Sequence, residues 1–393
     1  MVVEIGLVGC PSSGKSTFFK ALTLKDVKIA PYPFTTIEPN EGLGFVRARC
    51  PCKELNLAGK CKQCIDGTRF VPVKLWDVAG LVPDAHLGRG RGVAFLDDLM
   101  QASALIHIVD VSGTTDSEGN PSKGFDPSET VDMLKREIDF WLLGIFKKDW
   151  RTYLQKKECD QIFCKRFAGL GIDDTHLKQA MAKSRFDFNK LEQYSEDELV
   201  DFMDKIRQQS KPMIVAANKY DVPGSEENLR KLRDAMEEPS DAVPASAEME
   251  LALKEAATHG LVDYLSGSPN FSVRLESILT EKQKTGLGMV KHYLERNKST
   301  GVQQCLEKAV FELLDMIVVY PVEDEMHFSR KDGTILPDAL LVKNGTTAHE
   351  LAYKIHKDIG DKFIAAINAR TKQHVSADYK LKNGDIISIK AGR

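Results

Sequence analysis

No uninterrupted apolar run of about 18 residues or more occurs in this sequence, so a membrane-spanning helix is not predicted. The strongest candidate, residues 309–322, is interrupted by Glu312 and Asp315. The first residues include no basic segment and no small-residue cleavage site, so a secretory signal peptide is not expected either. We therefore expect a cytoplasmic protein that does not bind membranes.

The sequence also has no large excess of charge of either sign. Its 54 basic and 57 acidic residues give a net charge of −3. This balance excludes a strongly basic, histone-like binder of nucleic acid, but it leaves room for a local basic face. The chain has 393 residues, of which 42% are hydrophobic, so we expect a globular protein of roughly two or three domains.

Short apolar runs predict buried strands at 2–8, 71–76, 104–111 and 213–217. Asp, Asn or Gly follows each run closely, and helical patterns separate the runs, which is typical of an α/β protein with a parallel sheet. The stretch 113–210 is far longer than a parallel crossover requires. It contains an N-cap motif at Asp126 and a capping box at Ser195–Glu198, so we expect a helical insertion there.

The C-terminal third has two different patterns. Apolar spacing first indicates a helical connector, with helices at 273–282, 286–294 and 302–314. Strand-like runs then appear together with one capped helix, which suggests a small β-grasp domain. The expected strands lie at 317–322, 340–342 and 386–390, and the expected helix lies at 347–359.

The segment Gly9–Ser16 matches the phosphate-loop pattern G-x-x-x-x-G-K-[ST], follows a predicted strand and opens a predicted helix. Glycines let the backbone turn so that its N–H groups point into one concavity, and the helix N-terminus adds positive potential. We expect Lys15 to reach the β- and γ-phosphates and Ser16 to hold Mg²⁺. The residues expected to contact the nucleotide here are Gly9, Ser12, Ser13, Gly14, Lys15, Ser16 and Thr17.

Two further motifs follow predicted strands. The sequence Asp77-Val-Ala-Gly80 places a carboxylate where it would reach Mg²⁺ through water, and Gly80 where its N–H would approach the γ-phosphate. The sequence Asn218-Lys219-Tyr220-Asp221 points to guanine, because a carboxylate can accept from the N1–H and the 2-amino group, and adenine offers neither donor.

The rest of the base pocket is expected from neighbouring residues. Asn218 and the stem of Lys219 would shape it, and Ala245-Ser246-Ala247 fits a base-binding loop. In that loop the Ala247 N–H would face guanine O6. We therefore expect a preference for GTP and GDP over adenine nucleotides.

Taken in this order, the motifs resemble a Ras-like GTPase of the Obg type, in particular its YchF-related branch. The segment Tyr32–Asn40, Asp77–Val82 and the glycine-rich run Gly88–Gly92 carry the resemblance further. The C-terminal residues resemble a TGS domain, a β-grasp module, with Asp332-Gly-Thr, Asn344-Gly-Thr-Thr and Leu381–Ile387 in its pattern. The resemblance implies a P-loop GTPase domain with a helical insertion and a TGS domain. The implied parts are a GTPase domain at 1–112 and 211–272, an insertion at 113–210, a connector at 273–317 and a TGS domain at 318–393.

The same resemblance implies a Mg²⁺-dependent hydrolysis of GTP to GDP and phosphate. Lys15, Thr36 and Gly80 would be the catalytic residues, and Ser16, Thr36 and Asp77 would hold Mg²⁺; Thr35 stays open as an alternative to Thr36. A leucine, Leu81, stands where Ras-like enzymes have their water-orienting glutamine. We therefore expect slow hydrolysis that a partner, a monovalent cation or another residue such as His86 completes. Some related GTPases carry in the phosphate loop, where this chain has Ser12, an asparagine that is tied to potassium-stimulated hydrolysis, so Ser12 puts activation by potassium in doubt.

Four cysteines form the pattern C-x-C-x₈-C-x₂-C within a predicted hairpin at 45–70. They are Cys50, Cys52, Cys61 and Cys64. Four thiolates on a short hairpin suit a structural Zn²⁺ site with no open position for catalysis. Disulfides and free thiols remain alternatives, and the family resemblance does not decide between them.

The last 40 residues, from Lys354 to Arg393, contain nine basic and four acidic side chains. Together with the resemblance to a TGS domain, this local excess indicates contact with RNA phosphates or the ribosome. The favoured function is a GTP-driven switch on the ribosome or another RNA assembly. The alternative is a stand-alone nucleotide hydrolase in metabolism or stress, whose substrates could include ATP. The oligomeric state is not predicted.

Overall fold

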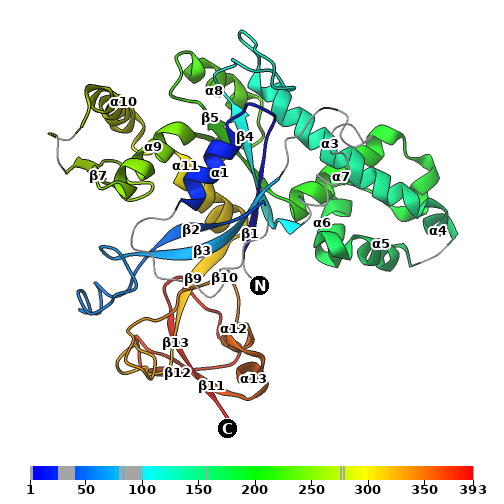
Figure 1. The fold of residues 1–393 in the computed structure, drawn as a ribbon. Helices are drawn as coiled ribbons and strands as arrows, with labels where there is room; N and C mark the ends of the chain where they lie inside the picture. Colours follow the sequence, from blue (N-terminus) through cyan, green and yellow to red (C-terminus); the bar gives the residue numbers. More distant parts are fainter. Residues whose placement is uncertain are drawn as a thin grey trace.

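A mostly parallel sheet forms the centre of the N-terminal part of the protein (Figure 1). The computed structural model describes residues 3–24, 40–78, 83, 99, 101–155, 158–274, 277 and 279–392. Within these ranges six strands pair in the order β2-β3-β1-β4-β5-β6, and of these six β2 runs antiparallel to its neighbour. The predicted parallel α/β sheet is therefore confirmed. The strands are β1 (Glu4–Val8), β2 (Glu41–Arg49), β3 (Thr68–Asp77), β4 (Ala104–Asp110), β5 (Met213–Asn218) and β6 (Ala242–Pro244).

Helices cover both faces of this sheet, because its central strands are apolar on both sides. All of β4 is buried, and β1 is buried from Ile5 to Val8. On one face α1 (Lys15–Thr23) packs beside α9 (Ala247–Thr258) and α11 (Val302–Glu307). On the other face α3 (Pro127–Lys148) and α7 (Glu196–Ser210) share a core with β4.

The long connection between β4 and β5 is helical, as the sequence predicts, and the two strands are parallel neighbours. Asp126 accepts a hydrogen bond from Ser128 N at the start of α3, and Ser195 and Glu198 form the capping box of α7. The insertion projects to one side of the sheet (Figure 1) around a core of stacked aromatic rings. Between α3 and α7 lie α4 (Trp150–Gln155), α5 (Cys159–Phe167) and α6 (Asp174–Ser184). None of the helices within the described ranges is long and apolar enough to cross a lipid bilayer.

The segment after α9 differs from the sequence prediction. A helix at 273–282 is wrong, because Val273 lies in a short strand and α10 (Glu281–Asn297) begins after Thr280. The capping box of Thr280 and Gln283 sets the first turn, and apolar periodicity alone does not locate it. The remaining elements here are α8 (Ser225–Asp234), β7 (Val262–Asp263), β8 (Ser272–Val273) and the π-helical turn Lys308–Leu313 that follows α11.

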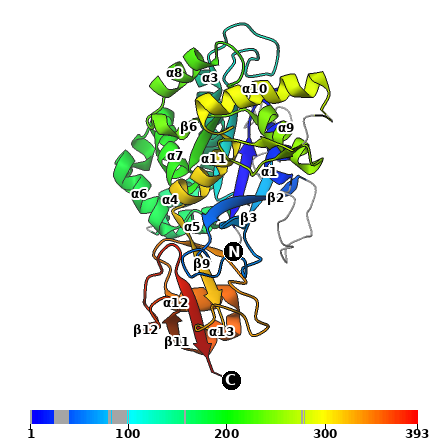
Figure 2. The same ribbon diagram turned by 90° about the vertical axis from the view of Figure 1, so that its left-hand side faces the viewer.

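The C-terminal part forms a second sheet of five strands, seen below the first in Figure 2, in the order β10-β9-β13-β11-β12. Its central strand β13 pairs in parallel with β9, and the β-grasp fold is confirmed. The sequence predicts three of these strands and misses β11 and the short, polar β12. The strands are β9 (Met316–Val322), β10 (Leu340–Lys343), β11 (Phe363–Asn368), β12 (Gln373–Val375) and β13 (Ile386–Ala391).

The single helix predicted at 347–359 is wrong in length, although Thr347 and Glu350 do form its capping box. The segment consists of two helices, α12 (Ala348–Ile355) and α13 (Lys357–Asp361). His356 separates them, because its backbone is extended and its ring nitrogen accepts from Asp358 N. Hydrophobic periodicity continues across such a break and therefore does not reveal it.

Candidate nucleotide-binding site

The loop between β1 and α1 has a backbone that requires glycine at two places. Gly14 stands at the N-cap of α1 with φ 90°, in the left-handed region, and a side chain there would collide with Asn218. A Cβ on Gly9 would lie 2.6 Å from the carbonyl oxygen of Ile108 in β4. The loop is therefore held close to both β4 and the end of β5.

The N-terminus of α1 is arranged for an anion. Among the residues that the structure describes, no side chain caps this helix end, and its first turn contains no acidic residue. The first N–H groups of a helix have no intrahelical acceptor and carry its positive dipole end. Ser13 is 2% exposed, and its hydroxyl oxygen has no partner among the described residues. Ser16 and Thr17 lie in the same first turn. These observations fit a phosphate chain lying across residues 9–17.

Lys15 and Asp77 come together although 62 positions separate them in sequence. The parallel register of β1 with β3 pairs Leu7 with Asp77, so Asp77 ends its strand beside the start of the loop. The ammonium group of Lys15 donates to the Asp77 carboxylate, and both side chains are largely buried. Thr36 and Gly80, together with Leu81 and His86, lie outside the described residues, so the structure says nothing of their predicted roles.

Asn218 connects the phosphate loop to the second loop of the predicted site. It ends β5 and is 2% exposed. Its Nδ2 donates to the carbonyl oxygen of Ser13 at 2.9 Å, and its Oδ1 accepts from the N–H of Ala247 at 3.0 Å. Ser246 is buried and caps α9 through the N–H of Met249. The sequence foresees neither contact of Asn218, and it assigns the Ala247 amide to guanine rather than to a protein partner.

Asp110 is a further polar residue of this region that the sequence analysis does not single out. It lies at the end of β4, is 6% exposed, and accepts from Lys219 Nζ at 2.8 Å and from Thr115 Oγ1 at 2.7 Å. Burial raises the pKa of its carboxyl group, but the hydrogen bonds from Lys219, Ser112 and Thr115 outweigh burial and leave the pKa below its ordinary value. A signal was present, because an Asp at the carboxyl end of a parallel strand lies at the binding edge of the sheet.

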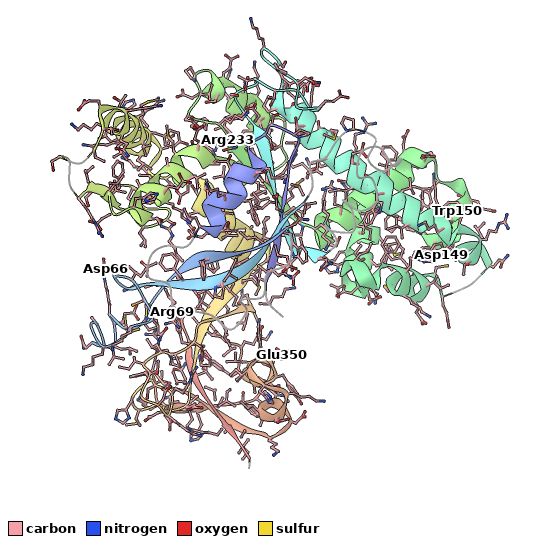
Figure 3. The ribbon with its side chains drawn as sticks, in the orientation of Figure 1. Asp66, Arg69, Asp149, Trp150, Arg233 and Glu350 are labelled. Carbon is pink, nitrogen blue, oxygen red and sulfur yellow. The ribbon has the colours of Figure 1, made fainter. Side chains whose placement is uncertain are left out.

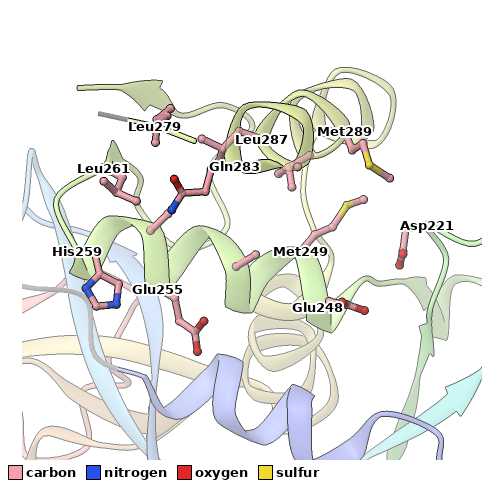
Figure 4. Close-up of a pocket in the computed structure, with 14 residues that line it drawn as sticks. Asp221, Glu248, Met249, Glu255, His259, Leu261, Leu279, Gln283, Leu287 and Met289 are labelled. Atoms are coloured by element: carbon pink, nitrogen blue, oxygen red, sulfur yellow. The ribbon is translucent and has the colours of Figure 1, made fainter. Parts of the chain in front are cut away.

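Asp221 follows this edge and stands at one end of a cavity of about 470 Å³ between α9 and α10. Figure 4 shows Asp221 apart from the other lining side chains, nearest to Glu248 and Met249 at the start of α9. The lining is mostly apolar, with Leu261 and Leu287 farther along. The Asp221 carboxylate is exposed and therefore available to a ligand.

Replacing Asn218 by alanine should weaken guanine-nucleotide affinity about 10- to 100-fold, because two buried backbone groups lose their partner and both loops loosen. The free energy of unfolding should fall by about 1–3 kcal/mol. Titration with a fluorescent GDP and denaturant unfolding measure the two effects. Asn228→Ala is the matched control, since Asn228 makes a similar bond to the backbone of Val111. An equal loss of affinity in both variants would contradict a special role for Asn218.

In this structure a phosphate loop is hydrogen-bonded to the Asn-Lys-x-Asp motif at the end of a parallel strand. This arrangement defines a P-loop protein of the guanine-nucleotide-binding class. Family comparisons agree along the chain. Residues 4–143 match the family "50S ribosome-binding GTPase", residues 216–324 match "Obg-like GTPase YGR210-like, G4 motif-containing domain", and residues 327–391 match the TGS domain. The chain belongs to the YchF-like family of GTP-binding proteins, with a P-loop GTPase domain and a C-terminal TGS domain.

Two relatives support this membership, and a third protein shares the fold. A GTP-binding protein of Methanocaldococcus jannaschii is 48% identical over 393 residues, covering 98% of each chain. The crystal structure of a GTP-binding protein from Pyrococcus horikoshii is 36% identical, with a TM-score of 0.77 over 99% of this chain and 100% of that one. The Schizosaccharomyces pombe YchF GTPase shares the fold, with a TM-score of 0.60 and 20% identity over 99% and 97% of the two chains.

Proposed function

We propose that this protein hydrolyses GTP to GDP and phosphate with Mg²⁺ and acts as a molecular switch on the ribosome or a related RNA assembly. The observation that carries the proposal is the pair of hydrogen bonds by which Asn218 donates to the carbonyl oxygen of Ser13 and accepts from the N–H of Ala247. It joins the loop expected to hold the phosphates to the loop expected to hold the base. A nucleotide spanning both loops would therefore bind to one preformed unit.

The phosphate side of the proposal assigns a task to each residue. Gly9, Ser12, Ser13 and Gly14 would shape the cradle, while Lys15 and the N–H groups of Ser16 and Thr17 would bind phosphate oxygens. Ser16 and Asp77 would hold Mg²⁺ together with Thr36, and the ion would neutralise charge on the β- and γ-phosphates. Lys15 would exchange the Asp77 carboxylate for phosphate oxygens as the nucleotide enters.

The base side of the proposal rests on Asp221 at the open end of its cavity. Its carboxylate would accept from the N1–H and the 2-amino group of guanine. Lys219, held by Asp110, would lie along the base. Ser246 and Ala247 would close the pocket, with the Ala247 N–H shared between Asn218 and guanine O6. If ATP binds as tightly as GTP, the proposed function changes to that of a stand-alone nucleotide hydrolase that accepts ATP.

Hydrolysis itself is assigned to Lys15, Thr36 and Gly80, with no glutamine at position 81 to orient water. A slow intrinsic rate follows, and a partner, a monovalent cation or another residue would complete the site. The order of domains proposed here is a GTPase domain (1–112 and 211–272), a helical insertion (113–210), a connector (273–317) and a TGS domain (318–393). The insertion and the TGS domain would respond to the nucleotide state.

Ribosomes should stimulate GTP turnover about tenfold or more at fixed Mg²⁺ and salt, because they would supply the missing groups of the site. The measurement is phosphate release with and without purified ribosomes, together with co-sedimentation. The excess of basic side chains in the last 40 residues should be needed, so Lys380→Glu combined with Lys382→Glu should reduce the stimulation. Lys178→Glu in the helical insertion is the control. An absence of both stimulation and co-sedimentation would exclude the ribosome as the partner.

A further inference from the structure

The four cysteines of the β2–β3 connection converge on one point. The sulfur atoms of Cys50, Cys52, Cys61 and Cys64 all lie within 4.8 Å of one another. The Cys52 and Cys64 sulfurs are 3.5 Å apart, and those of Cys50 and Cys61 are 3.9 Å apart. With Zn–S bonds of about 2.3 Å, sulfurs at the corners of a tetrahedron lie about 3.8 Å apart. The cluster therefore has the dimensions of a tetrathiolate zinc site.

The backbone around the cluster is organised like a metal-binding turn. The N–H of Cys50 donates to the carbonyl oxygen of Gly67 at 2.8 Å, that of Leu57 to the carbonyl oxygen of Cys52 at 2.8 Å, and that of Cys61 to the carbonyl oxygen of Leu57 at 3.1 Å. Backbone hydrogen bonds of this kind fix the turns that carry the four cysteines. Cys50, Cys52 and Cys61 are less than 10% exposed, so an ion held among the sulfur atoms would be shielded from water.

An independent observation comes from Arg69, the second residue of β3. It is 1% exposed, its Nε has no partner, and no carboxylate pairs with it among the described residues. A buried guanidinium without a counter-charge costs several kcal/mol. In the register of β2 with β3, Arg69 lies opposite Ala48, two residues before Cys50. A zinc ion with four thiolates carries a net charge of −2 and would supply the missing counter-charge.

Arg69 also connects the cluster to the C-terminal domain. Its two Nη atoms donate to the carbonyl oxygens of Leu336 and Pro337, at 3.0 and 2.7 Å. Figure 3 shows Arg69 where the β2–β3 hairpin meets the C-terminal sheet, with Asp66 farther out on the hairpin. The cluster cysteines share one hydrophobic core with residues of β9 and β13.

Two further contacts cross the same junction. The Tyr320 hydroxyl donates to the carbonyl oxygen of Arg49, at 3.0 Å. Arg370 pairs with Glu54, at 2.8 Å. The loop that carries the cysteines is therefore the surface on which the TGS domain rests.

We infer that Cys50, Cys52, Cys61 and Cys64 bind one structural Zn²⁺, and that this ion holds the β2–β3 loop in the shape that seats the TGS domain on the GTPase domain. The ion would have no open coordination position for catalysis, because the four thiolates fill its tetrahedral coordination. Arg69 would link the ion to the C-terminal domain through its hydrogen bonds to residues 336–337. The inference does not rest on GTP hydrolysis or on any ribosomal partner.

The first test is the metal content of the full chain purified without chelators. Elemental analysis should find about one zinc per chain, and Cys61→Ser combined with Cys64→Ser should lose it, while Cys164→Ser in the helical insertion keeps it. Because the double variant can fail to fold, wild-type protein is also stripped and reloaded with Co²⁺. The absorption of a tetrahedral cobalt tetrathiolate is then expected. Iron in place of zinc, no cobalt spectrum, or a denatured mass four hydrogens lighter from two disulfides would each overturn the assignment.

The second test measures domain seating by hydrogen exchange of the wild-type chain before and after zinc removal. Exchange should accelerate about tenfold or more in the loop 50–67 and in the peptide that contains Leu336 and Pro337. Helices α3 to α7 serve as the internal control and should stay unchanged. If zinc leaves and exchange around Leu336 is unaltered, the ion does not seat the TGS domain and that part of the inference fails.

Discussion

Replacing Lys15 by alanine should lower GTP turnover by about 100- to 1,000-fold, the loss that follows removal of one preorganised transition-state donor. Lys15 begins α1 and contacts Asp77, so its ammonium group lies between the phosphate loop and the carboxylate expected at Mg²⁺. Without it, charge that builds on the phosphates in the transition state would meet one cation fewer. Single-turnover phosphate release at saturating GTP measures the effect on the chemical step.

Lys20→Ala is the matched control for this experiment. Lys20 lies on the same helix, is well exposed, and pairs with Glu255 at 2.8 Å. Its loss should leave turnover unchanged, because an exposed ion pair contributes little. Thermal unfolding of both variants separates catalysis from stability, since Lys15→Ala also removes the partner of Asp77. If Lys15→Ala retained turnover within about threefold of the wild type, the assignment of the phosphate loop would be wrong.

Changing Asp221 to asparagine should reduce GTP affinity about 100-fold and raise xanthosine triphosphate affinity by a similar factor. An asparagine oxygen still accepts from N1–H, but its amide group opposes the 2-amino group of guanine and donates well to the 2-carbonyl of xanthine. The result is a change of specificity rather than a loss of binding. Competition of the two nucleotides against a fluorescent GDP measures it directly.

Asp234→Asn provides the control, because Asp234 is another exposed aspartate, at the end of α8. It should alter neither affinity. Unchanged GTP binding by the Asp221 variant would show that the base lies elsewhere, and tight ATP binding by the wild type would remove the argument for guanine. Neither result would affect the prediction for Lys15. The two experiments therefore test guanine recognition and phosphate binding independently.

Features that depend on neighbouring residues could be predicted from the sequence. The phosphate loop is one example, because Gly14, Lys15 and the start of α1 are set by a strand, a turn and a helix in immediate succession. The capping boxes of Ser195 and Thr347 are others, since both partners lie within four residues. The prediction of a helix at 273–282 is wrong because hydrophobic periodicity alone does not locate the first residue of a helix.

Tertiary structure decided the contacts whose partners lie far apart in the chain. Asn218 reaches Ser13 because β5 and β1 flank β4 in the sheet, an order that the motif alone does not specify. Arg69 is an unremarkable residue in the sequence, yet folding buries it between the cysteine cluster and residues 336–337. By itself, the sequence determined which chemical groups the protein carries and the local turns that present them. Packing determined which groups meet, because burial and long-range pairing depend on the whole arrangement of strands and helices.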